Sequence, residues 1–292
     1  MNLYTLAIGL FTYIFFLPLS SYANEDADDS SFKESYFDCP CPHLMAHRGA
    51  SGNYPESTKL AFKKAIRFQT DILELDVHLS KDGEIIVSHD ASLLRTTGQD
   101  IEIKDTKSNK IKNFDAGYMF SKKEGVFPFR GKKIKMLTLK NLMEAFPNAR
   151  FNIEIKPNSE KLAIKLSRYI NKLGINKRVV VGSKHTEALE VFRNHKNQKT
   201  LTSAHLSDIV RAYISWVFNL DIKDAPYQIL QLPYNFVNQS LVEYFHKQNK
   251  TVHVWTVNEP EDIKHMLLIK VDGVMTNYPE LAYPIFVELG LR

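Results

Sequence analysis

Cysteine is almost absent from this chain: 292 residues contain only Cys39 and Cys41, which stand together in a Cys-Pro-Cys-Pro run. A disulfide that spans a single intervening residue closes a strained ring. A metal site needs more ligands than these two thiols, although His43 lies close by. Two free thiols in a stiff linker and one strained disulfide are therefore both compatible with the sequence.

Zinc-finger spacings, aromatic-basic RNA motifs, internal repeats and low-complexity tracts are also missing from the body of the chain. These absences argue against a nucleic-acid-binding protein. The net charge of +5 is modest and would help to attract an anionic substrate or a membrane surface. A hydrophobic content of 44% and a charged content of 24% are those of a folded globular protein. The length accommodates a single barrel of about 250 residues.

The first 23 residues lack any charged side chain, and residues 3–19 are nearly all apolar. Ser21-Tyr22-Ala23 has the small-x-small pattern of a cleavage site, and an acidic stretch follows it. We therefore predict a signal peptide over 1–23, cleaved near Ala23, then a linker over 24–42 and export to the periplasm or the medium. An uncleaved N-terminal membrane anchor is the alternative, because no Lys or Arg precedes the apolar run and its length approaches that of a spanning helix.

Short β-branched runs alternate with helical patterns from residue 43 to the end of the chain. Nearly continuous apolar strands are typical of a parallel sheet buried on both faces. The repeated alternation predicts an α/β fold, a (β/α)8 TIM barrel over 43–292. Nine strands are one too many, so one of them lies off the barrel or is not a strand. The strands expected are 44–47, 72–77, 85–89, 151–156, 179–182, 200–203, 229–232, 251–257 and 273–276, and the helices are 57–68, 137–145, 159–173, 186–194, 206–218, 240–248 and 260–269.

Two stretches interrupt the alternation. Lys81-Asp82-Gly83 predicts a tight turn that joins the second and third strands without a helix. Residues 91–135 are rich in lysine and glycine and have no clear helical period. We expect a small insertion here, between strands three and four and over the carboxyl end of the barrel, where substrate-selecting loops belong.

Charged side chains stand within or directly after several predicted strands, where burial is costly unless they are paired or bind a metal. Alternation in a strand places side chains two apart on one face. Carboxylates can hold a hard cation, an arginine can bind phosphate through two bonds, and imidazoles can transfer protons, so the set predicts metal-assisted attack on a phosphate ester. The residues are His47 and Arg48 after the first strand, Glu74 and Asp76 on the second, His89 after the third, and Glu154 and Lys156 on the fourth.

These segments resemble the glycerophosphodiester phosphodiesterase family, in order and from about residue 44 to residue 279. Each motif is short, but the complete ordered set is specific. The matching segments are His47-Arg48-Gly49, Pro55-Glu56-Ser57-Thr58, Glu74-Leu75-Asp76-Val77, Lys81-Asp82-Gly83, His89-Asp90, Leu94-Arg95-Thr96-Thr97, Asn152-Ile153-Glu154-Ile155-Lys156-Pro157, Val254-Trp255-Thr256-Val257-Asn258 and Asp272-Gly273-Val274-Met275-Thr276-Asn277-Tyr278-Pro279.

The resemblance implies a barrel enzyme that cleaves glycerophosphodiesters to glycerol 3-phosphate and an alcohol with one divalent metal. The oxygen-only ligands favour Mg²⁺ or Ca²⁺ over zinc. Which histidine is the acid, and whether water or a substrate hydroxyl attacks, stay open. The implied roles are proton transfer for His47 and His89, metal binding for Glu74, Asp76 and Glu154, phosphate binding for Arg48 and Lys156, support of the site for Glu56, and an apolar pocket wall for Trp255.

Two other functions are compatible with the same residues. A phospholipase D-like or phosphoinositide-cleaving relative acting on lysophospholipids would have an apolar rim around its pocket. A non-catalytic binding protein on the same barrel would have lost a histidine or a carboxylate, and none is missing. Peripheral contact with a membrane and the oligomeric state are both left open by the sequence.

Several residues outside the site set have structural interpretations. Ser57 replaces the Asn that is usual in the family, and we expect it to cap the following helix. His78 shares a face with Glu74 and is expected to pack or to form a hydrogen bond at the strand end. Trp216 and Phe218 are expected on a buried helix face, with a membrane-facing patch as the alternative.

Overall fold

Eight parallel strands form a nearly closed barrel in residues 35–292, the part of the chain that this computed structural model describes. Their order is β7-β6-β5-β2-β1-β10-β9-β8, and a parallel bridge between Ser203 and Ile229 links the end of β7 to β8. The predicted (β/α)8 TIM barrel is therefore confirmed. The strands are β1 (His43–Ala46), β2 (Ile72–Leu79), β5 (Arg150–Ile155), β6 (Val179–Gly182), β7 (Leu201–Thr202), β8 (Ile229–Pro233), β9 (Thr251–Trp255) and β10 (Gly273–Thr276).

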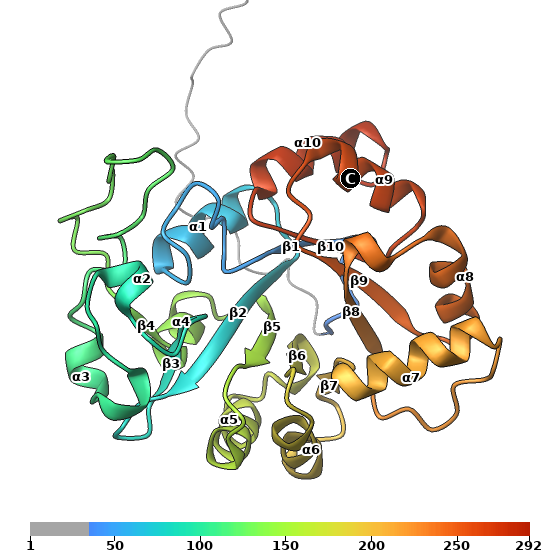
Figure 1. The fold of residues 1–292 in the computed structure, drawn as a ribbon, viewed down its shortest axis with the longest axis horizontal. Helices are drawn as coiled ribbons and strands as arrows, with labels where there is room; N and C mark the ends of the chain where they lie inside the picture. Colours follow the sequence, from blue (N-terminus) through green and yellow to red (C-terminus); the bar gives the residue numbers. More distant parts are fainter. Residues whose placement is uncertain (1–34) are drawn as a thin grey trace, which may run out of the picture. The chain divides into compact units, whose positions relative to one another are not determined.

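The helices form an outer layer around these strands (Figure 1). Side chains on the inner faces of the helices pack on the outward faces of the strands: Phe62 and Leu166, for example, belong to the same buried cluster as Leu75 and Ile153. All seven predicted helices are present. The outer helices are α1 (Lys59–Arg67), α4 (Leu139–Ala145), α5 (Glu160–Leu173), α6 (Thr186–His195), α7 (Leu206–Val217), α8 (Gln239–Lys247), α9 (Pro260–Leu268) and α10 (Pro279–Glu288), with 3₁₀ turns η3 (Asn176–Arg178) and η4 (Tyr234–Phe236).

The surplus strand among the nine predicted is the third, 85–89, which lies off the barrel. β3 (Ile85–Val87) pairs antiparallel with the outer end of β2 and with the two-residue β4 (Leu137–Thr138). The turn between β2 and β3 is the one predicted at Lys81-Asp82-Gly83, and Gly83 has a φ of 84°, a conformation that glycine adopts without a steric penalty. The third barrel strand is consequently β5.

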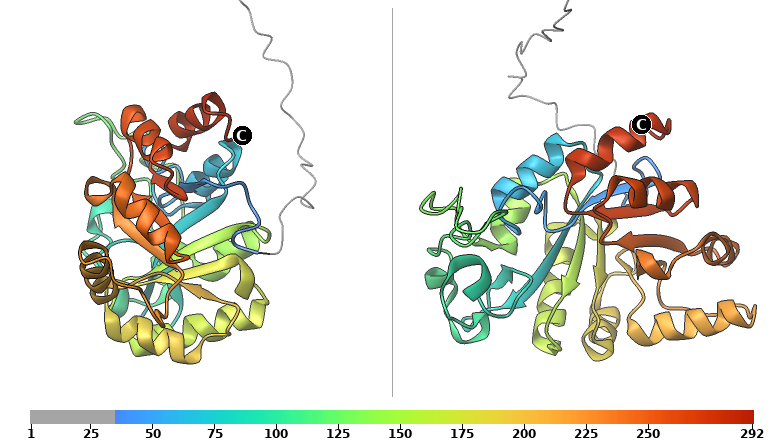
Figure 2. Two further views of the ribbon diagram at one scale, coloured as in Figure 1. Left: turned by 90° about the vertical axis from the view of Figure 1, so that its right-hand side faces the viewer. Right: turned by 45° about the horizontal axis from the view of Figure 1, so that its top comes forward.

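The insertion follows β3 and carries its own small core. Ile86, Leu93, Ile103 and Ile111 are buried together, although the segment showed no helical period. It lies on the side of the barrel opposite α7 in Figure 1 and in the right-hand view of Figure 2. Its regular pieces are α2 (Leu94–Thr97), η2 (Ile103–Asp105) and α3 (Ser108–Ile111).

The insertion also reaches the carboxyl end of the barrel. Lys122 forms a hydrogen bond with Asn53, in the loop after β1, and its ammonium lies 5.3 Å from the ring centre of Tyr278, after β10. The ring of Phe129 lies 6.2 Å from that of Tyr54. These contacts place the insertion beside the loops that follow β1 and β10.

The described residues settle the state of the cysteines but not the export prediction. Cys39 and Cys41 are free, so no disulfide joins them. None of the described helices has the length and apolar character needed to span a bilayer. The predicted signal peptide over 1–23 and most of the linker lie outside the described residues, and both stay predictions.

A pair of buried histidines lies at the amino end of the barrel. His43 Nδ1 is 3.2 Å from His253 Nε2, and both side chains are buried beneath Tyr36. Burial lowers the pKa of His43 to about 4, with a further contribution from the charges of Arg292 and Arg150. Burial also lowers the pKa of His253 well below its usual value.

This pair predicts a loss of stability in acid. Both imidazoles are neutral in the folded state but titrate near pH 6.5 in the unfolded chain, so unfolding takes up protons as the pH falls from about 6.5 towards 4. His43 alone is expected to lower the free energy of unfolding by up to about 3 kcal/mol over that interval. Urea titrations at pH 7 and pH 4.5 measure the loss. His43→Gln should show a smaller loss, and an equal loss would assign the pH dependence to other groups.

Candidate active site

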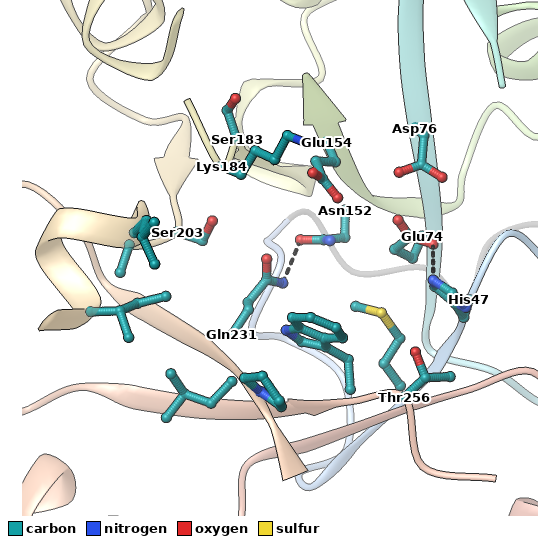
Figure 3. A pocket seen from close by; sticks show the side chains of 18 of the residues that line it. His47, Glu74, Asp76, Asn152, Glu154, Ser183, Lys184, Ser203, Gln231 and Thr256 are labelled. Carbon is teal, nitrogen blue, oxygen red and sulfur yellow. Dashed lines mark hydrogen bonds and ion pairs between the residues drawn. The ribbon is translucent and has the colours of Figure 1, made fainter. Parts of the chain in front are cut away.

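One cavity of about 640 Å³ opens at the carboxyl end of the barrel. Every predicted site residue except Glu56 lines it. The charged side of the cavity is formed by residues of β2, β5 and the loops after β1 and β3, and the side chains of His47, Glu74 and Glu154 point into the same space (Figure 3). The predicted residues found there are His47, Arg48, Glu74, Asp76, His89, Glu154, Lys156 and Trp255.

The pairing of β2 with β5 brings the carboxylates together. Asp76 lies opposite Glu154 in the parallel register, and Glu74 lies one inward-facing position before Asp76. One oxygen from each of the three carboxylates lies within 4.8 Å of the other two. Glu74 and Asp76 are buried, whereas Glu154 is partly exposed.

The three carboxylates offer oxygen donors whose mutual repulsion a divalent cation would relieve. Burial raises the pKa of Glu74 well above its usual value, and the negative charge of Asp76 raises it further. Burial and the nearby Glu154 also raise the pKa of Asp76, to about 7, against the lowering effects of Lys156 and Arg48. Oδ2 of Asp76 is buried and has no hydrogen-bond partner. A bound cation would satisfy this oxygen and offset the repulsion, so the three carboxylates could hold a metal ion.

Two cationic side chains flank the carboxylates. Lys156 Nζ lies 3.2 Å from Glu154 Oε1 and 3.5 Å from Asp76 Oδ1. Arg48 Nε lies 3.3 Å from Asp76 Oδ2 but has no hydrogen-bond partner, although it is buried. Both cations therefore line the cavity beside the carboxylate cluster, where they could bind phosphate oxygens.

His47 is held by a neutral partner. Its Nδ1 lies 2.6 Å from Oδ1 of Asn277, and the hydroxyl of Ser51 donates to the same oxygen at 2.9 Å. Because that oxygen accepts, Nδ1 of His47 carries the proton, and Nε2 lies 4.0 Å from Glu74 Oε2. Burial and the charge of Arg48 lower the pKa of His47 to about 4. The neutral imidazole therefore presents an unprotonated Nε2 to the cavity.

His89 is held by an anionic partner instead. Its Nδ1 lies 2.7 Å from Asp90 Oδ1, and its carbonyl accepts a hydrogen bond from His78 Nε2 at 3.1 Å. This contact confirms the strand-end hydrogen bond predicted for His78. Burial lowers the pKa of His89 below its usual value, and the hydrogen bond to Asp90 offsets only part of that effect.

An arginine from the insertion connects both halves of the charged site. Arg95 donates two hydrogen bonds of 2.7 Å to Glu56 and one of 2.5 Å to Asp90. Glu56 in turn lies 3.3 Å from Arg48 Nη1, so it stands behind the cavity wall rather than in it. Burial would raise the pKa of Glu56, but the bonds from Arg95 and the charge of Arg48 outweigh it and lower the pKa.

Comparison with known proteins agrees with this site. Residues 47–281 match the model of the glycerophosphoryl diester phosphodiesterase family. This chain belongs to that family. A Bacillus altitudinis glycerophosphodiester phosphodiesterase is 31% identical over 252 residues, which cover 84% of this chain and 98% of the relative.

Two other similar proteins carry different descriptions. A human protein named lysophospholipase D is 27% identical and covers 80% of this chain and 83% of its own. The structure of an Oleispira antarctica phosphodiesterase, described in complex with the product sn-glycerol-3-phosphate, has a TM-score of 0.69 at 23% identity and covers 85% of this chain and 97% of its own. The latter likeness supports the barrel fold of this family member.

Sequence reasoning missed three of the supporting residues. Asn277, Asp90 and Arg95 each lie within segments that carry the family resemblance, but no role followed from their spacing. Asn277 is 230 residues from His47, and Arg95 is 39 residues from Glu56. A polar residue directly after an expected strand, as Asn277 is after β10, was the available signal.

The opposite side of the cavity is apolar and was not predicted beyond Trp255. The first two turns of α7 contribute Leu206, Ile209 and Tyr213, and the loop after β8 contributes Phe236. Polar groups on this side are few. Ser183, Lys184, Ser203 and Gln231 are among them, and Gln231 donates to Asn152 at 2.8 Å (Figure 3).

The predicted cap at Ser57 is wrong. The N-cap of α1 is Thr58, whose hydroxyl accepts from the backbone of Ala61. Ser57 instead has a φ of 57°, its backbone N–H donates to the carbonyl of Arg48, and its buried hydroxyl has no hydrogen-bond partner. The left-handed conformation is one that Asn tolerates better than Ser, which accounts physically for the Asn that is usual at this position.

Relieving this conformation is expected to stabilise the protein. Ser57→Gly should raise the free energy of unfolding by on the order of 0.5–1 kcal/mol, because glycine has no steric penalty at positive φ and the unpaired hydroxyl is removed. Ser57→Asn should have an effect of the same sign, since Asn also visits this region. Thermal unfolding of the three proteins measures the change. A lower melting temperature for both variants would contradict the interpretation.

Proposed function

We propose that this protein hydrolyses glycerophosphodiesters to glycerol 3-phosphate and an alcohol. The observation that carries the proposal is the convergence of three carboxylates, two histidines and two cations in one cavity of a barrel that belongs to the glycerophosphodiester phosphodiesterase family. The 31% identical relative of that name supports the same activity. None of the histidines and carboxylates proposed for catalysis is missing from the chain, which argues against a non-catalytic binding role.

Glu74, Asp76 and Glu154 would hold one divalent cation, and their oxygen-only donors favour Mg²⁺ or Ca²⁺. When bound, the cation would supply positive charge to the phosphoryl oxygens. Arg48 and Lys156 would bind the remaining phosphate oxygens and stabilise the charge that develops on them.

His47 is the better candidate for the base and His89 for the acid. His47 is neutral and presents Nε2 to the cavity, so it can accept the proton of the attacking oxygen. The carboxylate of Asp90 favours the protonated form of His89, which can then give a proton to the leaving alcohol oxygen. Overall, water adds across the phosphoester bond: one P–O bond forms and the bond to the alcohol breaks.

Incubation of the purified protein with glycerophosphocholine tests the activity. Glycerol 3-phosphate and choline should appear with Mg²⁺ or Ca²⁺ and should not appear after chelation. Readdition of each metal separately then identifies the cation. Product formed equally well in the presence of chelator would contradict the metal requirement, and no product under any condition would contradict the activity.

Lysophospholipids are a second candidate substrate class, favoured by the apolar side of the cavity. Leu206, Ile209, Tyr213 and Phe236 could contact an acyl chain that a water-soluble diester lacks. Hydrolysis of lysophosphatidylcholine would release choline and leave lysophosphatidic acid. The ratio of kcat/KM for lysophosphatidylcholine to that for glycerophosphocholine decides between the two classes.

Export is proposed on the sequence alone. The apolar run over residues 3–19 and the small residues up to Ala23 support a cleaved signal peptide, with an N-terminal anchor as the alternative. N-terminal sequencing of the protein recovered from an expressing cell distinguishes them. A first residue of Asn24 supports cleavage, and a retained Met1 supports the anchor.

A further inference from the structure

Helix α7 exposes apolar side chains on the face that does not pack on the barrel. Leu206, Val210, Ile214 and Val217 recur at intervals of four, four and three residues, so they share one face of the helix, and all are at least half exposed. We call these four residues the α7 stripe. Phe218, directly after the helix, is 69% exposed, so the buried position expected for it is wrong. Exposed apolar stripes of this kind mark sites of interaction.

The stripe does not result from a loosely attached helix. Ala212 is buried on the opposite face, and Tyr213 and Trp216 pack against the buried cluster under α8 and α9. The Tyr213 hydroxyl donates to the carbonyl of Phe236 at 2.8 Å. The N-terminus of the helix is capped by His205 and Asp208. The helix is therefore firmly packed on the barrel, so its outer face is apolar because of the residues it carries and not because the helix has moved away from the core.

The charges on α7 suit a phosphate-rich surface. The helix contains two charged residues, Asp208 and Arg211. Asp208 is buried and paired with Arg193 at 3.1 Å, so it presents no charge outwards. Arg211 is exposed beside the stripe. An apolar face with a flanking cation and no outward anion on the helix is compatible with contact with the phosphate-rich interface of a bilayer.

The stripe is continuous with the active-site cavity. Leu206 belongs to both, and Ile209 and Tyr213 line the cavity from the same helix. Phe236 and Trp255, which also line the cavity, are 69% and 42% exposed. An apolar surface thus runs from inside the cavity over its rim to the outer face of α7. A protein partner seated there would cover the cavity mouth, whereas a lipid surface would deliver an amphiphilic substrate to it.

We propose that the α7 stripe, with Phe218 and Phe236, docks the barrel on the surface of a phospholipid bilayer with the cavity mouth facing the lipid. The docking itself is independent of catalysis. Its consequence, access to lysophospholipids in the bilayer, rests on the proposed function. A second copy of this chain seated on the same face is the competing occupant.

The chain contains two tryptophans: Trp255 lines the cavity and is 42% exposed, whereas Trp216 packs on the inner side of α7. Quenching of Trp255 therefore reports contact of the cavity mouth with lipid, and the N-terminal apolar run contains no tryptophan that could contribute to it. Vesicles of phosphatidylcholine with brominated acyl chains should quench the fluorescence of the full chain, and vesicles of unbrominated lipid should not. Sedimentation with the vesicles but without quenching would overturn the proposal.

A triple variant tests the α7 stripe, and a matched triple variant controls for non-specific binding of exposed apolar side chains to lipid. Val210→Gln, Ile214→Gln and Val217→Gln together should weaken vesicle-dependent quenching by at least about tenfold in lipid concentration, because three apolar groups are lost from the contact. Glutamine keeps a high helix propensity. The control carries Gln at three comparably exposed positions on α9 and α10, namely Leu268, Leu281 and Val287. Equal weakening in the control would overturn the assignment to α7.

Two further measurements separate the outcomes. The substituted α7 residues do not line the cavity, so the triple variant should turn over soluble glycerophosphocholine at the wild-type rate, which also shows that it is folded. Sedimentation velocity that finds a dimer in the wild type but not in the triple variant, with no quenching by lipid, would assign the face to a second copy. Quenching by brominated lipid in a protein without phosphodiesterase activity would uphold the docking and overturn the proposed function instead.

Discussion

Replacing His47 with alanine is expected to lower kcat for glycerophosphocholine by about 10²–10⁴-fold, the range that a positioned acid or base contributes. Nε2 of His47 is unprotonated and opens into the cavity beside the carboxylate cluster, and among the described residues its one hydrogen-bonding or ionic neighbour is Glu74, at 4.0 Å. KM should change much less, because His47 is proposed to act in the transition state. His265→Ala, at an exposed position on α9, is the control and should keep wild-type activity.

The same experiment can be extended to the division of roles between the histidines. A general acid must be protonated, so activity is lost as the pH rises through its pKa. Asp90→Asn removes the carboxylate that favours protonated His89, and the alkaline limb of the pH–rate profile should move to lower pH. Movement of the acid limb instead would assign the acid role to His47.

Glu74→Gln is expected to abolish most of the stabilisation by Mg²⁺ or Ca²⁺. Loss of a carboxylate ligand should weaken the metal affinity by at least about 100-fold. Mutation of a residue that only hydrogen-bonds to a metal ligand already lowers metal affinity by about 10–100-fold. At a metal concentration of 100 times the wild-type Kd, the wild type would gain about 2.7 kcal/mol of stability and the variant about 0.4 kcal/mol or less. Calorimetric titration and thermal unfolding, with and without metal, measure both quantities.

The same variant should behave in the opposite way once metal is removed. In the chelated protein, burial and the charge of Asp76 disfavour ionised Glu74, which is why its pKa is raised. A neutral Gln avoids this cost, so the chelated variant should melt at a higher temperature than the chelated wild type at pH 7. The control Glu259→Gln, at an exposed position, should change neither the metal affinity nor the melting temperature of the chelated protein. A variant that is less stable in chelator would show that Glu74 is structural rather than a metal ligand.

The carboxylate cluster was predictable because a buried strand has a period of two. Glu74 and Asp76 had to share one face of their strand, as did Glu154 and Lys156, and charges in apolar strands require partners. Parallel pairing of β2 with β5 then brings the two strands together. The identity of the neighbouring strand could not be read from an apolar run, which is why the sequence did not show which of the nine predicted strands lies off the barrel.

Other features depended on contacts between distant parts of the chain. Asn277 contacts His47 only because β10 is the neighbour of β1 in the barrel. Helix α10 was missed because Pro284 stands inside it and its apolar residues lack a clear stripe. The exposed face of α7 was misjudged for a different reason. A helical period shows which residues share a face, but it does not show whether that face is covered.

His89 reaches the active site from a different buried cluster than the carboxylates that could hold a metal ion do. Glu74, Asp76 and Glu154 stand on strands of the barrel, whereas His89 follows β3, which is paired to the outer end of β2 and backed by the small core of the insertion. We expect that core to open before the barrel unfolds, because small clusters at the edge of a domain have lower local stability than the main core. Activity would then be lost at a lower denaturant concentration than metal binding, because His89 would be displaced while the three carboxylates still hold the proposed ion.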